Sequence, residues 1–173
     1  VGILLGINQG AVVTGNLCVG CYGFALYSKG CGATTRPIMC QNTVVLTNQF
    51  GAARAAALGV AIQGATNNAD TLFQNNVVYA QTDLYRYVDV GTSQAATFVK
   101  NDYYSAGPTG FTSPWSYQSS LYTTFAAWAA AHETEALNVD PLFTSYNQFN
   151  TRATSPLRRT GTWCTNAARD HRG

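Results

Sequence analysis

Four charged residues in the middle of the chain are the side chains best placed to do chemistry on a polysaccharide. They are Asp83, Arg86, Asp89 and Lys100. Elimination from an acidic sugar needs a base that removes a proton beside a carboxylate, and cations that neutralise this carboxylate. The two aspartates could supply the base, and Arg86 and Lys100 the cations. An ordinary surface ion pair is the simpler explanation of the same residues.

Other catalytic arrangements have less support in the sequence. Glycoside hydrolysis needs two carboxylates that flank the bond. The chain has only 8 acidic residues, and among them Asp102 and Asp140 look structural. His132 and His171 lie far apart with no serine or cysteine in a nucleophile context, so no catalytic triad is expected. No phosphate-binding or dinucleotide-binding motif is present, so we expect no cofactor.

Aromatic residues crowd the second half of the chain and could form a surface for sugar rings. Ligand sites are mostly apolar with a few placed polar groups, and asparagine and glutamine amides could bind the sugar hydroxyls. Some of these aromatic side chains must belong to the core. The candidates for ligand binding are Tyr85, Tyr87, Trp115 and Tyr117.

The cysteines permit two interpretations. Four of the 5 cysteines fall between positions 18 and 40, which would formally supply the four ligands of a structural zinc site. The composition, rich in tyrosine and asparagine, is typical of extracellular proteins, where disulfides are the default. We therefore predict at least one disulfide, either Cys31–Cys40 or Cys18–Cys40, and no metal site.

Composition excludes several classes of protein. Charged residues are 10% of the chain, against about 25% on average. The net charge of +2 is too small to indicate nucleic-acid binding. No apolar stretch is long enough to span a bilayer. An extracellular or cell-surface location fits this neutral, polar composition best.

The strongest pattern is a repeat built on asparagine. An apolar residue lies three positions before each repeated asparagine, and two more apolar residues follow two and three positions after it. Asparagine tolerates the left-handed conformation of tight turns, and asparagines stacked in successive coils can form an amide ladder. The repeat predicts an all-β, parallel β-helix of about four coils over residues 1–104. The asparagines are Asn16, Asn42, Asn75 and Asn101.

Residues 105–173 do not continue the asparagine repeat and are predicted to form a C-terminal cap. Leu121, Phe125 and Trp128 recur at helical spacing, and Ser119 or Ser120 could cap the helix. We expect Phe125 and Trp128 to pack on the last coil. Asp140 precedes proline and is expected to be a turn residue.

The order of motifs in this half resembles that of a known superfamily. The motifs are Asn101 to Tyr104, Leu121 with Trp128, Asp140 to Phe143, Ser155-Pro156 and Asp170 to Gly173. This order is similar to the C-terminal part of bacterial secreted, right-handed parallel β-helix proteins, which are related to pectate lyases and phage tailspikes. The resemblance implies a right-handed solenoid. Members of the superfamily usually carry more coils before this point, where their clefts and catalytic groups lie.

The sequence is consistent with two functions. The first is a non-catalytic extracellular or surface scaffold that assembles with copies of itself, as a homo-oligomer or a filament, and/or binds glycans. The apolar, strand-like residues 1–7 favour it, because the open end of a solenoid exposes unpaired backbone groups. The alternative is the C-terminal portion of a polysaccharide lyase or glycoside hydrolase.

Overall fold

The computed structural model describes residues 3–6, 10–20, 24–29, 36–46, 58–63, 70–81, 86–92, 94–106, 114–145 and 149–158. Within these residues the regular structure is β-strand apart from one helix, and the strands are arranged in three sheets. The first sheet contains β1 (Ile3–Gly6), β4 (Phe24–Lys29), β7 (Leu58–Gln63), β10 (Arg86–Val90), β13 (Trp115–Tyr117) and β14 (Ser120–Tyr122), in that order. The second contains β2 (Val12–Thr14), β5 (Ile38–Cys40), β8 (Thr71–Gln74), β11 (Ala96–Val99) and β15 (Glu133–Thr134). The third contains β3 (Leu17–Val19), β6 (Thr43–Leu46), β9 (Val77–Ala80) and β12 (Asp102–Ser105).

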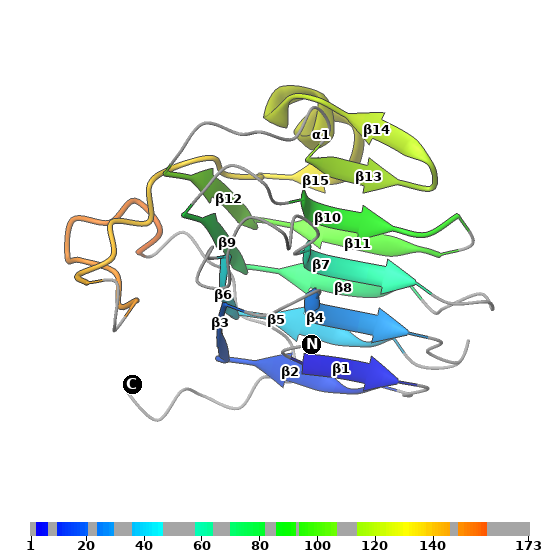
Figure 1. Cartoon of the computed structure of the whole chain (residues 1–173), viewed down its shortest axis with the longest axis horizontal. Helices are drawn as coiled ribbons and strands as arrows, with labels where there is room; N and C mark the ends of the chain where they lie inside the picture. Colours follow the sequence, from blue (N-terminus) through cyan, green and yellow to red (C-terminus); the bar gives the residue numbers. More distant parts are fainter. Residues whose placement is uncertain are drawn as a thin grey trace.

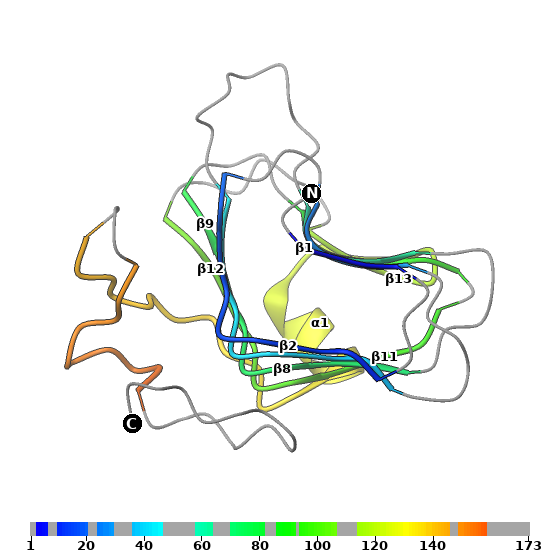
Figure 2. The same cartoon turned by 90° about the horizontal axis from the view of Figure 1, so that it is seen from below.

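The chain visits the three sheets in turn and adds one strand to each on every pass. Neighbouring strands are parallel throughout, except for β13 and β14, which form an antiparallel hairpin. The strands stack as layers in Figure 1, and the three sheets surround a common interior in Figure 2. We call one pass through the sheets a coil. The predicted parallel, β-helix-like solenoid is confirmed at this level.

Rows of aligned side chains fill the interior. Equivalent positions of successive coils are paired in register, so each inward position becomes a column of apolar groups. In the second sheet, the rings of Phe73 and Phe98 stack with centroids 5.3 Å apart. The three inward rows are Val13–Met39–Phe73–Phe98, Leu26–Val60–Val88–Trp115 and Cys18–Val44–Val78–Tyr103.

An asparagine ladder follows the turn between the second and third sheets. Its members are Asn16, Asn42, Asn76 and Asn101. Each side-chain Nδ2 donates to the Oδ1 of the next asparagine, over 3.0, 3.0 and 2.9 Å in chain order. The same Oδ1 atoms also accept the backbone N–H of the preceding member. Every rung therefore satisfies buried polar groups in two adjacent coils.

The predicted ladder is confirmed for three members and wrong for the third coil, where Asn76 takes the place expected for Asn75. Asn75 precedes the rung and adopts the left-handed conformation, with φ of 55°. Gln41 and Lys100 hold the same place in their coils, with φ of 56° and 54°. The left-handed residue is thus the one before the ladder asparagine. A slip of one residue in a strand moves every side chain to the opposite face, and only the Asn76 register turns Phe73 inward.

A hairpin and one helix cover the last coil. Gln118 and Ser119 both have positive φ, 48° and 71°, as a tight two-residue hairpin turn requires. The helix α1 spans Phe125–His132 and is capped by Thr124, whose hydroxyl accepts from the backbone N–H of Ala127 at 3.2 Å. The expected cap at Ser119 or Ser120 is wrong, because these residues belong to the hairpin.

The expected packing of the helix is confirmed. Trp128 is completely buried, and Phe125 is partly buried against the core. Leu121, the third residue of the predicted stripe, lies on β14 and is 59% exposed. The predicted helix therefore began one turn too early, because the helix in the structure begins at Phe125.

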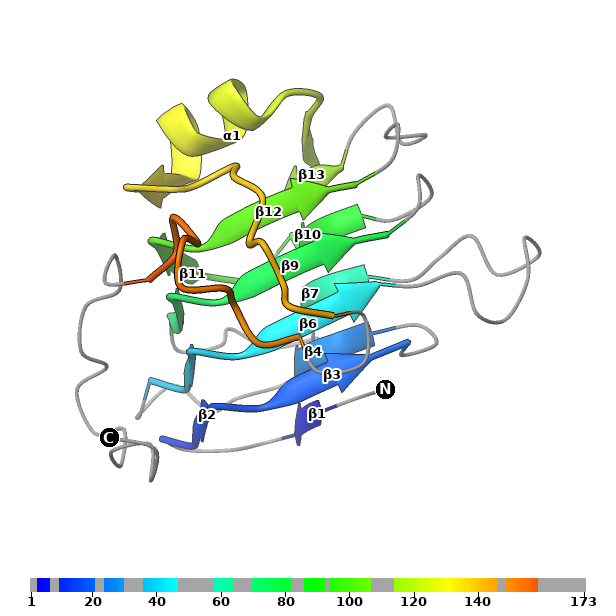
Figure 3. The same cartoon turned by 90° about the vertical axis from the view of Figure 1, so that its left-hand side faces the viewer.

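The residues after the last coil return along the outer face of the third sheet (Figures 1 and 3). We call the described residues 137–145 and 149–158 the C-terminal arm. Phe143 and Phe149 pack there with Val45 and Tyr79, and form a second apolar cluster outside the solenoid. Asp140 accepts from the backbone N–H of Leu142 at 2.8 Å, so its expected role as a turn residue is confirmed.

The cysteines do not stack as expected. Cys18 lies on β3 opposite Val44, whereas Cys40 lies on β5 between Thr14 and Gln74. The two cysteines are on opposite sides of the ladder turn, so the predicted Cys18–Cys40 pairing is wrong. Cys31 lies outside the described residues, and the Cys31–Cys40 disulfide stays a prediction.

Candidate functional site

Two of the four charged residues proposed for elimination chemistry are in contact, and a third pairs with another residue. Arg86 and Asp89 form an ion pair of 3.1 Å along β10, between residues three apart on one strand. Lys100 lies at the turn after β11 and pairs instead with Glu135 at 3.0 Å. Asp83 lies outside the described residues. The predicted catalytic cluster is therefore wrong for Lys100, because the turn carries it to a different side of the solenoid.

Two of the four aromatic candidates for sugar binding are core residues. Tyr87 and Trp115 are 3% and 4% exposed, with ring centroids 5.1 Å apart inside the solenoid. Tyr117 is half-buried and stacks on His132 at 4.2 Å. Tyr85 lies outside the described residues. The predicted aromatic platform is wrong for Tyr87 and Trp115, because their side chains complete the interior rather than the surface.

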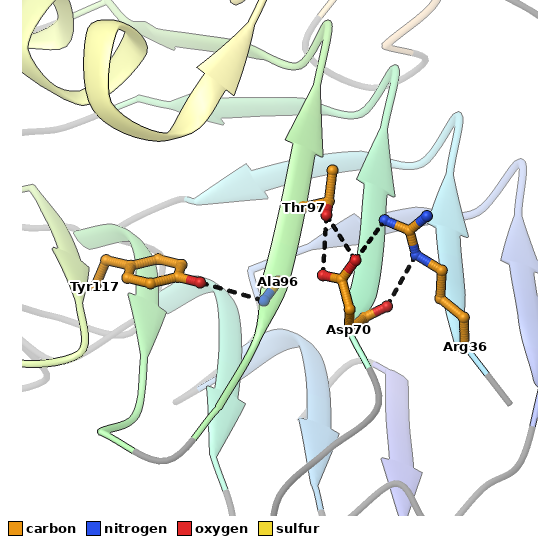
Figure 4. A network of polar contacts seen from close by, with 5 residues as sticks. All are labelled: Arg36, Asp70, Ala96, Thr97 and Tyr117. Carbon is orange, nitrogen blue, oxygen red and sulfur yellow. Dashed lines mark hydrogen bonds and ion pairs between the residues drawn. The ribbon is translucent and has the colours of Figure 1, made fainter. Parts of the chain in front are cut away.

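A polar network joins three coils on the second sheet (Figure 4). Arg36 pairs with the Asp70 carboxylate at 2.9 Å and also donates through Nε to the Asp70 carbonyl. Thr97 donates its hydroxyl to the same carboxylate at 2.9 and 2.7 Å. Both carboxylate oxygens have partners, so the network ties neighbouring coils together.

The best candidate site is a cavity between the ladder turn and the C-terminal arm. Its volume is about 330 Å³. The turn contributes one wall, and the arm contributes the other through Leu137, Thr151, Leu157 and Arg158. The remaining lining residues are Gln41, Asn42, Thr43, Asn75, Asn76, Val77, Lys100 and Asp102. The sequence gives no signal for this cavity, because its two walls come from segments far apart in the chain.

Asp102 is the unusual residue of this cavity. It begins β12 and is only 1% exposed. Its Oδ1 accepts from the backbone N–H of Val139 at 2.9 Å. Its Oδ2 is buried and has no hydrogen-bond partner among the described residues. A buried oxygen without a partner is rare, because desolvation then goes uncompensated.

Burial also changes the acidity of Asp102. Desolvation raises the pKa of its carboxyl from 3.8 to about 7, although the hydrogen bond from Val139 opposes this change. The charges of Asp140 and Glu133 raise the pKa further. Both protonation states of Asp102 are therefore populated near neutral pH.

A second buried carboxyl, Glu133, has a structural role. Its Oε1 accepts from the backbone N–H and the side-chain amide of Asn101, at 2.8 and 2.7 Å. Its Oε2 accepts from the indole N–H of Trp128 at 2.9 Å. Burial raises the pKa of Glu133 above its usual value, although these hydrogen bonds oppose the rise. Glu133 thus ends the ladder and fastens the helix to it.

We expect the free energy of unfolding to depend on pH through the ionisation of Asp102. An acid whose folded pKa is raised stabilises the fold fully below its unfolded pKa and loses this contribution as pH rises to the folded value. Between pH 4 and 7 the loss is on the order of 3–4 kcal/mol at 1.36 kcal/mol per pH unit. Asp102→Asn removes this pH-dependent loss. The free energy of unfolding in urea should therefore increase for the variant relative to the wild type as pH rises from 4 to 7. A difference between the two proteins that does not change with pH would contradict the assignment.

The cavity offers one ionisable carboxyl rather than a pair, so it lacks the two facing carboxylates of glycoside hydrolysis. Among the described residues, no group of three or more histidine, cysteine, aspartate or glutamate side chains is arranged to hold a metal ion. In the same part of the chain, no helix has the length and apolar character needed to cross a membrane.

The fold defines a mostly β, parallel solenoid. No protein-family model, curated protein or solved structure matches the chain. Any functional assignment therefore rests on the geometry of the molecule.

Proposed function

We propose that this protein is a non-catalytic β-helical scaffold that associates with a second copy of itself through its N-terminal coil. The observation that carries the proposal is the end formed by β1, β2 and β3. Among the described residues, each of these strands is the outermost of its sheet and pairs with a neighbour on one side only. Such strand edges are templates for pairing with another chain.

Exposed apolar side chains adjoin these edges. Leu17 and Val19 are 48% and 38% exposed on β3, and Val12 is 36% exposed on β2. Val19 continues the outward row of Val45, which the C-terminal arm covers in the coils above. The surface that already binds an apolar segment of this chain thus extends to the N-terminal coil, where Leu17 and Val19 are partly exposed and no described residue of the C-terminal arm covers them.

The opposite end supports a closed dimer rather than a filament. Trp128 and the β13–β14 hairpin cover the last coil, and Trp128 is completely buried there. A head-to-tail stack would need both ends open. Contact between two N-terminal coils uses the same surface on both copies and closes by two-fold symmetry.

The charged residues also support a non-catalytic role. Asp70, Asp89 and Glu135 are in ion pairs, and Glu133 is bound to the ladder and to the helix. Asp140 stabilises its own turn by accepting a hydrogen bond from the backbone N–H of Leu142. Asp102 is the remaining acidic residue in the described part of the chain, and a single carboxyl does not make the pair that glycoside hydrolysis needs, so these arrangements favour the scaffold over a polysaccharide lyase or a glycoside hydrolase.

The remaining features of the proposal follow from the repeat, the composition and the resemblance in sequence. We propose a right-handed solenoid with four complete coils, placed outside the cell or on its surface, and related to the pectate-lyase-like and tailspike-like proteins. Right-handedness is supported by the general rule that crossovers between parallel strands are right-handed in about 98% of cases.

Sedimentation velocity on the wild type and two matched variants tests the proposal. We expect the wild type to be a dimer and Leu17→Asp to be a monomer, because a buried charge would face the second copy. Leu121→Asp places the same charge on an exposed leucine at the opposite end, and this variant should remain dimeric. A wild-type monomer, or dissociation by Leu121→Asp instead of Leu17→Asp, would overturn it.

A further inference from the structure

We propose that Tyr122 is a site of one-electron oxidation in this protein, with His132 as the acceptor of its phenol proton. The phenol oxygen of Tyr122 and Nε2 of His132 are 2.6 Å apart. Tyr122 ends β14 and His132 ends α1, and these two elements lie side by side above the last coil in Figure 1. The pair belongs to the cap, at the opposite end from the N-terminal coil, so the proposal does not depend on self-association.

The existing hydrogen bond gives the oxidation a path for its proton. A phenol that loses an electron alone becomes a radical cation, which is a far stronger acid than the phenol, so oxidation is easier when a base takes the proton at the same time. An outer-sphere oxidant such as hexachloroiridate(IV) takes one electron from the Tyr122 ring and is reduced to hexachloroiridate(III). The O–H bond of Tyr122 breaks and an N–H bond forms at His132 Nε2. The products are a neutral tyrosyl radical and an imidazolium.

His132 is suited to receive this proton. It is half-buried, and burial lowers the pKa of its imidazole below the ordinary value, so the ring is neutral near neutral pH. A neutral imidazole has one nitrogen that accepts a hydrogen bond, and Tyr122 can donate to it. Tyr117 stacks on the imidazole with centroids 4.2 Å apart, and the Trp128 ring lies at 5.0 Å. Both rings can stabilise the imidazolium that forms, because a cation is attracted to an aromatic face.

Two neighbouring tyrosines have less suitable partners. The Tyr117 hydroxyl accepts from the backbone N–H of Ala96 at 3.5 Å, and an amide N–H cannot take a proton. Tyr103 is almost completely buried and bonds to Glu133. The Glu133 oxygens already accept from Asn101 and from Trp128, which makes this carboxyl a poorer proton acceptor than a free imidazole nitrogen.

A chain of aromatic rings leads from the interior to Tyr122. Trp115 and Trp128 stack with centroids 6.5 Å apart, and Trp128 meets Tyr122 edge-on at 5.8 Å. Rings this close exchange an electron readily, so an oxidising equivalent on a core tryptophan can move outward to Tyr122. Loss of the phenol proton to His132 then holds it there.

Oxidation of the full chain by hexachloroiridate(IV) in the presence of a nitrosoalkane spin trap tests the proposal. Mass spectrometry of the peptides locates the trapped radical, and we expect most of the adduct at Tyr122. Rapid mixing measures the rate at which this adduct forms. The rate should be lower in deuterium oxide than in water, because the proton moves together with the electron.

Three variants separate the proton acceptor from the surrounding rings. His132→Gln keeps an oxygen that accepts a hydrogen bond but is barely basic, so the rate at Tyr122 should fall by about a hundredfold. Tyr122→Phe should remove the adduct from this position. The matched control is Tyr117→Phe, which keeps the ring stacked on His132 and loses only a hydroxyl, and it should be oxidised at Tyr122 as fast as the wild type.

Melting curves show that each variant is folded before the rates are compared. An adduct found mainly at another tyrosine or at a tryptophan would overturn the proposal, and so would equal rates in water and deuterium oxide. The same holds for a folded His132→Gln protein that is oxidised at Tyr122 as fast as Tyr117→Phe. The isotope effect is measured on the wild type and decides the question even if His132→Gln does not fold. None of these readouts depends on the oligomeric state, so failure here is distinguishable from failure of the scaffold proposal.

Discussion

Replacing Trp128 with alanine should lower the free energy of unfolding by about 3–5 kcal/mol. Trp128 is completely buried between the helix and the last coil. Its ring meets Phe98 edge-on at 5.1 Å and stacks on Trp115 at 6.5 Å. The substitution also removes the indole N–H that binds Glu133, and leaves a buried carboxylate oxygen without this donor.

Urea unfolding followed by circular dichroism measures this effect. The matched control is Leu121→Ala in the same cap, where the side chain is 59% exposed and the change should stay within about 0.5 kcal/mol. Equal stability of the Trp128→Ala protein and the wild type would show that the helix contributes nothing to closing the solenoid.

The second large effect is expected in the ladder, where Asn76→Ala should destabilise the fold by about 3–5 kcal/mol. The Asn76 amide donates to the Met39 carbonyl and to Asn101, and its Oδ1 accepts twice from Asn42. Alanine leaves several of these buried groups without a partner, at about 1–3 kcal/mol each.

Asn75→Gly is the control that separates the two adjacent asparagines. Asn75 has φ of 55°, a conformation that glycine adopts without strain, so this variant should differ from the wild type by less than about 1 kcal/mol. Chemical denaturation of both variants decides between the two registers. A larger loss for Asn75→Gly than for Asn76→Ala would contradict the ladder.

The repeating architecture can be predicted from the sequence alone. In a solenoid each coil meets only its neighbours, so the pattern within one coil is local and recurs along the chain. Asn16, Asn42 and Asn101 therefore marked the shared turn correctly, and the burial of Trp128 followed from the apolar spacing around it. Asp140 was correctly assigned to a turn because Pro141 follows it in the sequence.

Local ambiguity explains the error in the third coil. Two asparagines stand side by side at 75 and 76, and either gives a run of apolar residues at nearly the same offsets. Only packing against Met39 and Phe98 selects the register that turns Phe73 inward.

Which side chains face the interior, and which groups come into contact, depends on how the coils close and pack. Tyr87 and Trp115 look like any exposed aromatic residues in the sequence, yet the closure of the solenoid buries them. Lys100 is separated from Arg86 and Asp89 because the chain turns a corner between them.

The candidate site depends on the return path of the C-terminal arm. Nothing near Asp102 in the sequence indicates that Val139 will bind one of its oxygens, or that Leu157 and Arg158 will lie across the cavity from it. Burial, the raised pKa and the unpartnered oxygen arise together when the arm covers the third sheet. These properties come from contacts between distant segments, and a local sequence pattern cannot encode them.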